Sequence, residues 1–543
     1  MSKSADAESL KAQGNVLFGQ KQYKDAAVKY SAAIELSPDN AVLWSNRAAC
    51  YLNLRRYSDA ATDASRATEL DPSFARAWSR LATAEQNLGS WTTAIGAWEK
   101  ALSVLPVDGR SPAEEKQAVE YEEMLDNARR ALEATQENMQ ELVENNTINN
   151  LGGGKMPWQR AEGLREELVA KGQEGMFSSA WLILGAYEAW SEGVDIMNKL
   201  KKEVKNGRVA MTGSAIQQLS NAIMRDKRVF HIDDPEFLSK YNDQMQYEAH
   251  ARQAWQKGGA ELILKEAQER LAKADWNAVR PALSVTVRGY IIRAFLTAGL
   301  MEDDAAAVAF YDDVIGILQG GRQLWSDVDD DVRGVIFTKT FIRGVKALKL
   351  EAYMIAYKQG KQLFTLEKLK ELADDLEQDV RDDPPNPEEP MGPGFLLAFY
   401  NGPLAQALAM QALYERELAQ QGEDPVVVLP HLARAGELYA ESASHLPPDD
   451  ELHAWFLNSA LGVFWQGGAP LKTTLPLMQM VKSSVPQMKR IWEHSQLALG
   501  GRDKILQKTL WFEEDVQKAL KEGKVTMKDP VRIGAPEDPR NIS

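Results

Sequence analysis

Five polar side chains in the first eighty residues have the chemistry to bind an anion: Lys11, Asn15, Asn46, Arg76 and Arg80. The first two are four residues apart, and so are the last two, so each pair shares one face of a helix. All five side chains donate hydrogen bonds, and donors that carry a charge form the stronger bonds to a carboxylate. Such a set suits two carboxylates that lie close together, because these need several donors at once.

The segment that must position these side chains repeats itself every 34 residues. Small residues recur at Gly14, Ala48 and Ala82. The other matching positions are Pro38, Pro72 and Pro106; Ala26, Ala60 and Ala94; Ala33, Ala67 and Ala101; and Tyr23, Tyr57 and Trp91. Self-similarity at this period is typical of a solenoid of two-helix units. Small residues suit the points where paired helices cross closely, and proline ends each unit because it cannot continue a helix. Chance spacing in an alanine-rich bundle is the alternative.

With three registers in agreement, residues 5–106 resemble the tetratricopeptide repeat (TPR) family. The resemblance implies three hairpins, each of a helix A and a helix B, with the A helices lining a concave face. The B helix reads Ala-x3-Tyr-x2-Ala, as at Ala26, Tyr30 and Ala33. By this resemblance, the five donors all lie on A helices.

The donors themselves resemble the two-carboxylate clamp of the chaperone-binding TPR domains. In that subfamily the pattern is Lys, Asn, Asn, Lys, Arg, and it grips the C-terminal Glu-Glu-Val-Asp of the 70-kDa and 90-kDa heat-shock chaperones. Lys11, Asn15, Asn46 and Arg80 match the pattern, whereas Arg76 stands where the family has lysine. Arginine keeps the charge but changes length and geometry. The plainer alternative is that these are solvated polar residues on a helix face.

Charge sets this segment apart from the rest of the 543-residue chain. The whole chain has a formal net charge of −15, whereas residues 1–106 carry twelve Lys and Arg against eleven Asp and Glu. The acidic remainder argues against non-specific binding to nucleic acid or to anionic membranes. A single cysteine, Cys50, excludes an internal disulfide, and its default reading is a packed small hydrophobe. The start lacks the apolar core of a signal peptide, so we expect a cytoplasmic protein without membrane insertion.

The predicted fold class is all-α: a three-repeat TPR solenoid with a capping helix, followed by a large irregular helical region. The predicted divisions are repeats at 5–106, a capping or linker helix at 107–145, a Gly/Asn-rich linker at 146–157, a helical region at 158–380, a Pro-rich loop at 381–394, a TPR-like helical region at 395–528 and a disordered tail at 529–543. The stretch 283–292 alternates like a strand, but its continuation to residue 298 favours a buried helix. We recognise no family for residues after the repeats.

One later segment looks like a degenerate repeat. Ala435, Tyr439, Ser442 and Pro447 keep the spacing of Ala26, Tyr30, Ala33 and Pro38, and Glu451 would begin the next A helix. This spacing favours an irregular array of helical hairpins in the second half.

Patterns that would indicate catalysis, a cofactor or a metal are missing from the sequence. None of the six histidines has another four residues away, as a helical zinc site requires. His231 with Asp233 and Asp234 reads more simply as a turn, and the acidic run at 327–331 lacks the glycine of a calcium loop. We therefore expect no cofactor, no metal site and no enzyme.

These observations predict a co-chaperone or adaptor. Its repeats would bind the acidic C-terminal peptides of heat-shock chaperones, and its C-terminal helical region would hold a client or a second protein. One alternative is a scaffold whose groove holds a different peptide. The other is an enzyme after residue 155, recruited to chaperones by its repeats.

Overall fold

We describe the protein from a computed structural model, which covers residues 3–145, 156–200, 214–232, 234, 236–388 and 391–532. The described part of the chain is all-α, as predicted, apart from one isolated β-bridge between Pro470 and Pro530. It forms two compact units, and the chain passes between them three times. Unit 1 consists of residues 1–144 and 234–337, and unit 2 of residues 145–233 and 338–543. The predicted linker, up to residue 155, and the predicted tail beyond residue 532 lie outside the described residues.

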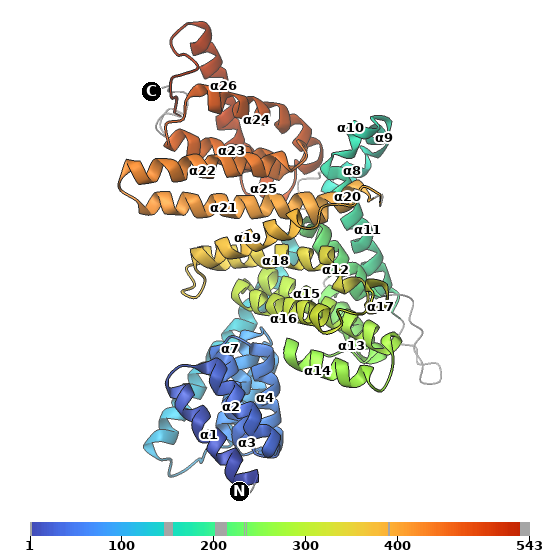
Figure 1. The fold of residues 1–543 in the computed structure, drawn as a ribbon, viewed down its shortest axis with the longest axis vertical. Helices are drawn as coiled ribbons and strands as arrows, with labels where there is room; N and C mark the ends of the chain where they lie inside the picture. Colours follow the sequence, from blue (N-terminus) through green and yellow to red (C-terminus); the bar gives the residue numbers. More distant parts are fainter. Residues whose placement is uncertain are drawn as a thin grey trace. The chain divides into compact units, whose positions relative to one another are not determined.

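Three helical hairpins, which we call the first array, begin unit 1 (blue in Figure 1). Their helices are α1 (Lys3–Gly19), α2 (Tyr23–Leu36), α3 (Ala41–Asn53), α4 (Tyr57–Leu70), α5 (Ala75–Asn87) and α6 (Trp91–Ser103). The small residues act as predicted. A Cβ at Gly14 would lie 2.8 Å from the Tyr30 ring, and Ala48 and Ala82 are fully buried.

A long helix, α7 (Pro112–Asn145), follows the first array. It begins with reciprocal capping, because the main-chain amide of Glu114 donates to the Ser111 hydroxyl and the Glu114 carboxylate accepts from the Ser111 amide. Tyr121 of α7 packs against Trp98 of α6, with ring centroids 5.5 Å apart. Helix α7 therefore covers an apolar face of the last hairpin, as the terminal element of a solenoid must.

The second segment of unit 1 is also helical. Its elements are α13 (Phe237–Arg252), α14 (Ala260–Leu271), α15 (Trp276–Met301), α16 (Asp304–Leu324), α17 (Asp330–Arg333) and η2 (Val335–Phe337). The predicted buried helix at 283–298 is confirmed as the middle of α15. Helix α15 alone among the described helices is long and apolar enough to cross a membrane, and 67% of its apolar window is buried inside the protein. The predicted helical region is interrupted between α13 and α14, where Gly258 has a φ of +107°.

This second segment packs against the first array through polar contacts. The Asp59 carboxylate on α4 accepts a hydrogen bond from the amide of Gly259 at 3.1 Å. A Cβ at Gly259 would lie only 2.1 Å from that carboxylate, so glycine is required at this close approach. Beside it, the Arg56 guanidinium pairs with Glu261 at 3.2 Å. The repeats are therefore part of a larger folded body.

Unit 2 begins with three short helices and two longer ones, and it continues as a stack of hairpins. The elements of its first segment are α8 (Pro157–Glu162), α9 (Arg165–Ala170), α10 (Gln173–Met176), α11 (Ser179–Asn198), α12 (Ala215–Asp226) and η1 (Lys227–Val229). The later elements are α18 (Lys339–Lys358), α19 (Leu366–Arg381), α20 (Pro393–Leu396), the π-helical turn η3 (Leu397–Asn401), α21 (Gly402–Gln421), α22 (Pro425–Ser444), α23 (Glu451–Gln466), α24 (Leu471–Trp492), α25 (Gln496–Leu499) and α26 (Arg502–Lys521).

Three consecutive hairpins of unit 2, α18–α19, α21–α22 and α23–α24, form what we call the second array (Figure 1). Each helix packs on the next one in this order. The degenerate repeat predicted from Ala435, Tyr439 and Ser442 is the buried face of α22, and α23 begins at Glu451 as predicted. The Ser442 hydroxyl donates to the main-chain carbonyl of Ala405 at 2.6 Å, so a small polar residue ties α22 to α21.

Candidate functional site

The five predicted donors come from the first helices of the three hairpins, whose common side we call the A-helix face of the first array. Lys11 and Asn15 lie on α1, Asn46 lies on α3, and Arg76 and Arg80 lie on α5. In the 34-residue repeat, Asn46 and Arg80 occupy the same position of successive hairpins, whereas Lys11, Asn15 and Arg76 occupy other positions on the same set of helices.

A chain of hydrogen bonds joins three of the donors. The Arg80 guanidinium donates to the Asn46 side-chain oxygen at 3.3 Å, and the Asn46 amide nitrogen donates to the Asn15 oxygen at 3.5 Å. The Asn15 oxygen also accepts from the Tyr30 hydroxyl at 2.7 Å. Because its oxygen is occupied, the Asn15 amide presents its nitrogen, a donor, and no acceptor for it lies among the described residues.

Arg80 is held in an environment that disfavours its charge. Burial is the main cause that lowers its pKa, and the neighbouring Arg76 guanidinium lowers it further. No carboxylate pairs with either arginine within the described chain. Arg76 is exposed, so the two cations form a like-charged pair four residues apart on one helix. A bound carboxylate would relieve this repulsion and restore the electrostatic balance.

Lys11 is the one predicted donor that is engaged elsewhere. Its ammonium group pairs with Glu8, one turn earlier on α1, at 2.5 Å. The Glu8 side chain is 62% exposed, and an exposed pair of this kind contributes little. The structure therefore brings together Asn15, Asn46 and Arg80 and sets Arg76 beside them, whereas Lys11 would have to leave Glu8 to join them.

Three further residues at this face were not predicted from the sequence. The Ser45 hydroxyl is fully buried and accepts from Arg80 at 2.6 Å. Tyr30 positions Asn15, as described above, and Tyr121 of α7 lies near enough to influence Arg80. Ser45 carried a usable signal, because it stands 34 residues after Lys11 and directly before Asn46.

Another arginine of the same array shows the contrasting, structural use of a cation. Arg47 forms two hydrogen bonds to the Asp63 carboxylate, at 2.7 and 2.8 Å, and a third to the Ser31 hydroxyl at 2.8 Å. This pair links α3 to α4 and α2, and burial raises the pKa of Asp63 to about 6 in spite of the arginine. Arg47 thus has a carboxylate partner, whereas the cations of α5 have none among the described residues.

The other residues that the sequence analysis considered for metal binding or reactivity pack or pair with neighbouring side chains. No cluster of His, Cys, Asp or Glu that could hold a metal ion lies within the described ranges. Cys50 is fully buried, and burial raises the pKa of its thiol to about 12, so it is inert. His231 stacks on Trp158 with centroids 4.7 Å apart, and Asp330 pairs with Arg333 at 2.5 Å.

The stacked hairpins, their period and the small crossing residues together define a known repeat. A family model for the tetratricopeptide repeat matches residues 17–84. The N-terminal repeats belong to the tetratricopeptide repeat family. The match runs from the end of α1 into α5, so Asn46, Arg76 and Arg80 lie within it, whereas Lys11 and Asn15 lie before it.

Relatives share these tetratricopeptide repeats over short segments. The chain is 51% identical over 45 residues to the heat shock protein sti1 homolog of Schizosaccharomyces pombe and 50% identical over 46 residues to serine/threonine-protein phosphatase 5 of Homo sapiens. It is 44% identical over 50 residues to Hsp70-Hsp90 organizing protein 3 of Arabidopsis thaliana. These segments cover 8–9% of this chain and 8–9% of the relatives' lengths. The likeness therefore concerns the repeats and not the whole proteins.

Proposed function

We propose that the A-helix face of the first array binds the C-terminal Glu-Glu-Val-Asp of a 70-kDa or 90-kDa heat-shock chaperone. The observation that carries the proposal is the half-buried Arg80, with Arg76 beside it and no carboxylate partner among the described residues. A terminal aspartate offers two carboxylates, the α-carboxylate and the side chain. Arg80, Asn46 and Asn15 offer donors from the first helices of three successive hairpins, and hydrogen bonds join the three side chains.

The relatives support this ligand class. One carries the name Hsp70-Hsp90 organizing protein 3 and another the name heat shock protein sti1 homolog. The chain would then be a cytoplasmic co-chaperone or adaptor, with a client or second protein bound by its C-terminal region. The phosphatase relative matches this chain over only 46 residues, so its activity is not carried over to this protein.

Energetics favour modest affinity. Each hydrogen bond to a charged group contributes about 1.5–3 kcal/mol net. Five donors, less the ordering of the peptide and the release of Lys11 from Glu8, give roughly −8 kcal/mol, or micromolar binding.

The test is a titration of the full chain with a fluorescent peptide ending in Met-Glu-Glu-Val-Asp, beside the same peptide amidated at its C-terminus. We expect binding that is lost on amidation and weakened in Arg80→Ala and Lys11→Ala. Matched controls are Arg66→Ala and Lys24→Ala, which remove exposed cations on the B helices α4 and α2.

Equal binding of the free and amidated peptides would contradict the clamp and favour the alternative, a scaffold for a different peptide. A loss of affinity in Arg66→Ala as large as that in Arg80→Ala would show that binding depends on the net charge of the protein and not on the position of Arg80. Either result would leave the repeat fold intact and move the search to residues after 155.

A further inference from the structure

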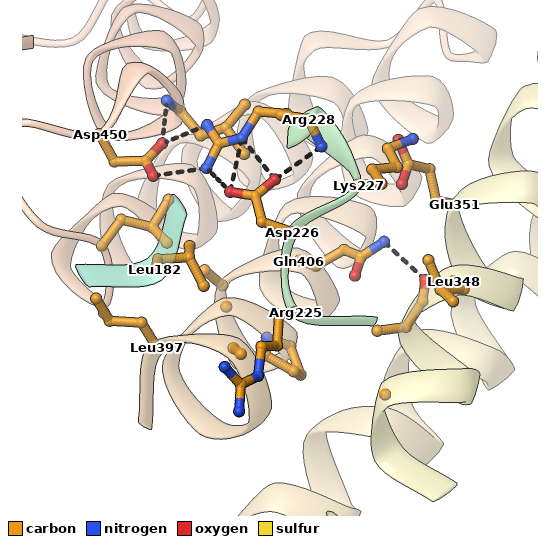
Figure 2. Close-up of a pocket in the computed structure, with 18 of the residues that line it drawn as sticks. Leu182, Arg225, Asp226, Lys227, Arg228, Leu348, Glu351, Leu397, Gln406 and Asp450 are labelled. Atoms are coloured by element: carbon orange, nitrogen blue, oxygen red, sulfur yellow. Dashed lines mark hydrogen bonds and ion pairs between the residues drawn. The ribbon is translucent and has the colours of Figure 1, made fainter. Parts of the chain in front are cut away.

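Unit 2 contains a cavity of about 340 Å³ on the A-helix face of the second array (Figure 2). Its walls come from α18, α21 and α23, the first helices of the three successive hairpins. The end of α12 and the turn η1 border it from the other side. A cavity lined by three such helices occupies the place in the second array that the clamp residues occupy in the first.

The lining is mostly apolar and partly solvent-accessible. The bulky side chains that are neither fully buried nor fully exposed are Leu182, Leu348, Met354, Met410, Leu452, Trp455 and Phe456. Methionine and aromatic side chains adapt to varied apolar ligands. An apolar cavity of about 150 Å³ accommodates one benzene molecule, so 340 Å³ has room for about two bulky side chains.

Charged groups at the cavity are paired within the protein. Lys227 pairs with Glu351 at 2.5 Å, and Arg228 lies between Asp226 at 2.7 Å and Asp450 at 3.0 Å, as Figure 2 shows. The lining holds three basic and three acidic residues, and the remaining cation, Arg225, donates to the main-chain carbonyl of Gly185 at 2.9 Å. This charge balance favours an uncharged ligand.

A buried network behind Arg228 holds that wall in place. The Arg228 guanidinium stacks on the Trp492 ring at 3.8 Å and approaches Glu451 at 3.3 Å. Glu451 in turn pairs with Arg502 at 2.6 Å, and both side chains are almost completely buried. The charged side of the cavity is therefore rigid, and a ligand must fit into the space beside it.

One polar group in the lining suits a peptide. The Gln406 amide nitrogen donates to the main-chain carbonyl of Ala347 at 3.0 Å, which fixes the side chain (Figure 2). Its oxygen accepts no hydrogen bond within the described residues and lies in the cavity lining, where a peptide N–H can donate to it.

We infer that this cavity binds an uncharged peptide segment with bulky aliphatic or aromatic side chains, which insert between α18, α21 and α23. The inference rests on the proposed adaptor function and names the chemistry of its second ligand. An extended apolar segment is what a partly unfolded polypeptide exposes, so the ligand class is a non-native protein chain.

The experiment uses the full chain and two fluorescein-labelled peptides, both amidated at the C-terminus so that neither offers a terminal carboxylate. One is Gly-Ser-Leu-Phe-Leu-Phe-Gly-Ser, and the other replaces each Leu with Asn and each Phe with Ser. We expect anisotropy to report binding of the apolar peptide alone. Met410→Glu should weaken that binding at least about tenfold, because it places a charge where apolar side chains insert. Met480→Glu, an exposed methionine of the same unit outside the cavity, is the matched control.

A second variant keeps the test decisive if Met410→Glu disturbs folding. Ala347→Phe fills the cavity with an apolar side chain and should also weaken binding at least about tenfold. Equal binding of both peptides, no binding of either, or an unchanged affinity in both cavity variants would overturn the inference. So would loss of apolar-peptide binding in Arg80→Ala, because the ligand would then occupy the first array. Titration of the same variants with the Met-Glu-Glu-Val-Asp peptide tests the proposed function separately.

Discussion

The two arrays place helices in the same order but handle charge in opposite ways. On the A-helix face of the first array, Arg80 and Arg76 stand side by side without a carboxylate partner among the described residues. In unit 2, Arg228 of η1 and Arg502 of α26 pair with acidic residues, among them Asp450 and Glu451 at the start of α23 in the second array. The first arrangement stores unfavourable electrostatics that a ligand relieves, and the second uses its cations to hold helices together.

The role of a cation therefore depends on whether a carboxylate pairs with it, and not on how many cations lie nearby. Burial disfavours the charge of a cation that has no carboxylate partner, whereas a nearby carboxylate favours the charged form. Within the first array, Arg47 with Asp63 already follows the second pattern. The comparison yields five predictions, and each changes one side of it.

The largest effect is expected from Arg502→Met in unit 2. Removing this cation leaves the Glu451 carboxylate buried without its 2.6 Å partner, which destabilises by about 3–5 kcal/mol. Calorimetry should show the transition of unit 2 lowered by about 10 °C. Arg434→Met, at an exposed ion pair of α22, is the control and should shift it by less than about 3 °C. Equal shifts would mean that the buried network adds nothing.

The same substitution in the first array, Arg80→Met, should have the opposite profile. Because the folded state disfavours the Arg80 charge, we expect the free energy of unfolding to change by less than about 1 kcal/mol. Affinity for the Met-Glu-Glu-Val-Asp peptide should fall about 10- to 100-fold, since charge-assisted hydrogen bonds are lost. A large loss of stability would place Arg80 with the structural cations and remove the contrast.

The stability of unit 1 should depend on pH. Burial, followed by the neighbouring Asp59 carboxylate, raises the pKa of Asp313 on α16 to about 8, and Ser58 and Arg56 oppose the shift. The folded unit 1 thus keeps a proton that the unfolded chain has lost above pH 4. Its stability should decrease as pH rises from 6 to 8, by roughly 1–2 kcal/mol.

Thermal unfolding at pH 6, 7 and 8 measures this effect, and Asp313→Asn should flatten the dependence. The control is Asp327→Asn, which changes an exposed residue of the same unit and should leave the slope as it is. An unchanged slope in Asp313→Asn would assign the pH dependence to other groups.

Salt should distinguish the ligands of the two arrays. Raising NaCl from 50 to 500 mM screens the carboxylate–cation attraction, so the acidic peptide should bind several-fold more weakly. The apolar peptide should bind as well or slightly better, because its burial involves no net charge. Parallel anisotropy titrations measure both, and equal salt sensitivity would contradict the assignment of the ligands to different faces.

The smallest effect is expected from Arg76→Gln. It removes the like-charged neighbour of Arg80 four residues away, so the free protein should gain about 0.2–0.5 kcal/mol of stability while its affinity for the acidic peptide falls. Denaturant unfolding measures the gain, and Arg66→Gln on α4, which breaks a pair with Glu69, should give none. A loss of stability in Arg76→Gln would show that Arg76 has a structural role.

Much of the first array could be predicted from the sequence because its period fixes which residues are neighbours. The 34-residue register predicted the three hairpins, and the family resemblance placed Asn15, Asn46 and Arg80 on their A helices, where hydrogen bonds join them. It could not predict that Lys11 pairs with Glu8 or that Ser45 supports Arg80, because both depend on side-chain conformations.

Far less of unit 2 could be predicted. The spacing of Ala435, Tyr439 and Ser442 predicted a B helix followed by an A helix from Glu451, and α22 and α23 lie at these positions. The cavity has no sequence signal of its own, because its lining comes from five α-helices, the turns η1 and η3 and one loop between residues 182 and 456, with no shared period. The sequence also did not predict that each unit consists of two separate segments of the chain, because a helical pattern does not indicate which segment a helix packs against.

The passage of the chain between the units has a consequence for biosynthesis. The hairpins of the first array are complete by residue 103, but the segment that packs on Asp59 and Arg56 lies at 234–337. At about 5–20 residues per second, a ribosome needs on the order of 10–40 s to supply that segment. During this interval the nascent repeats leave Asp59 and its neighbours on α4 uncovered, and the first part of unit 2 is synthesised before unit 1 can close.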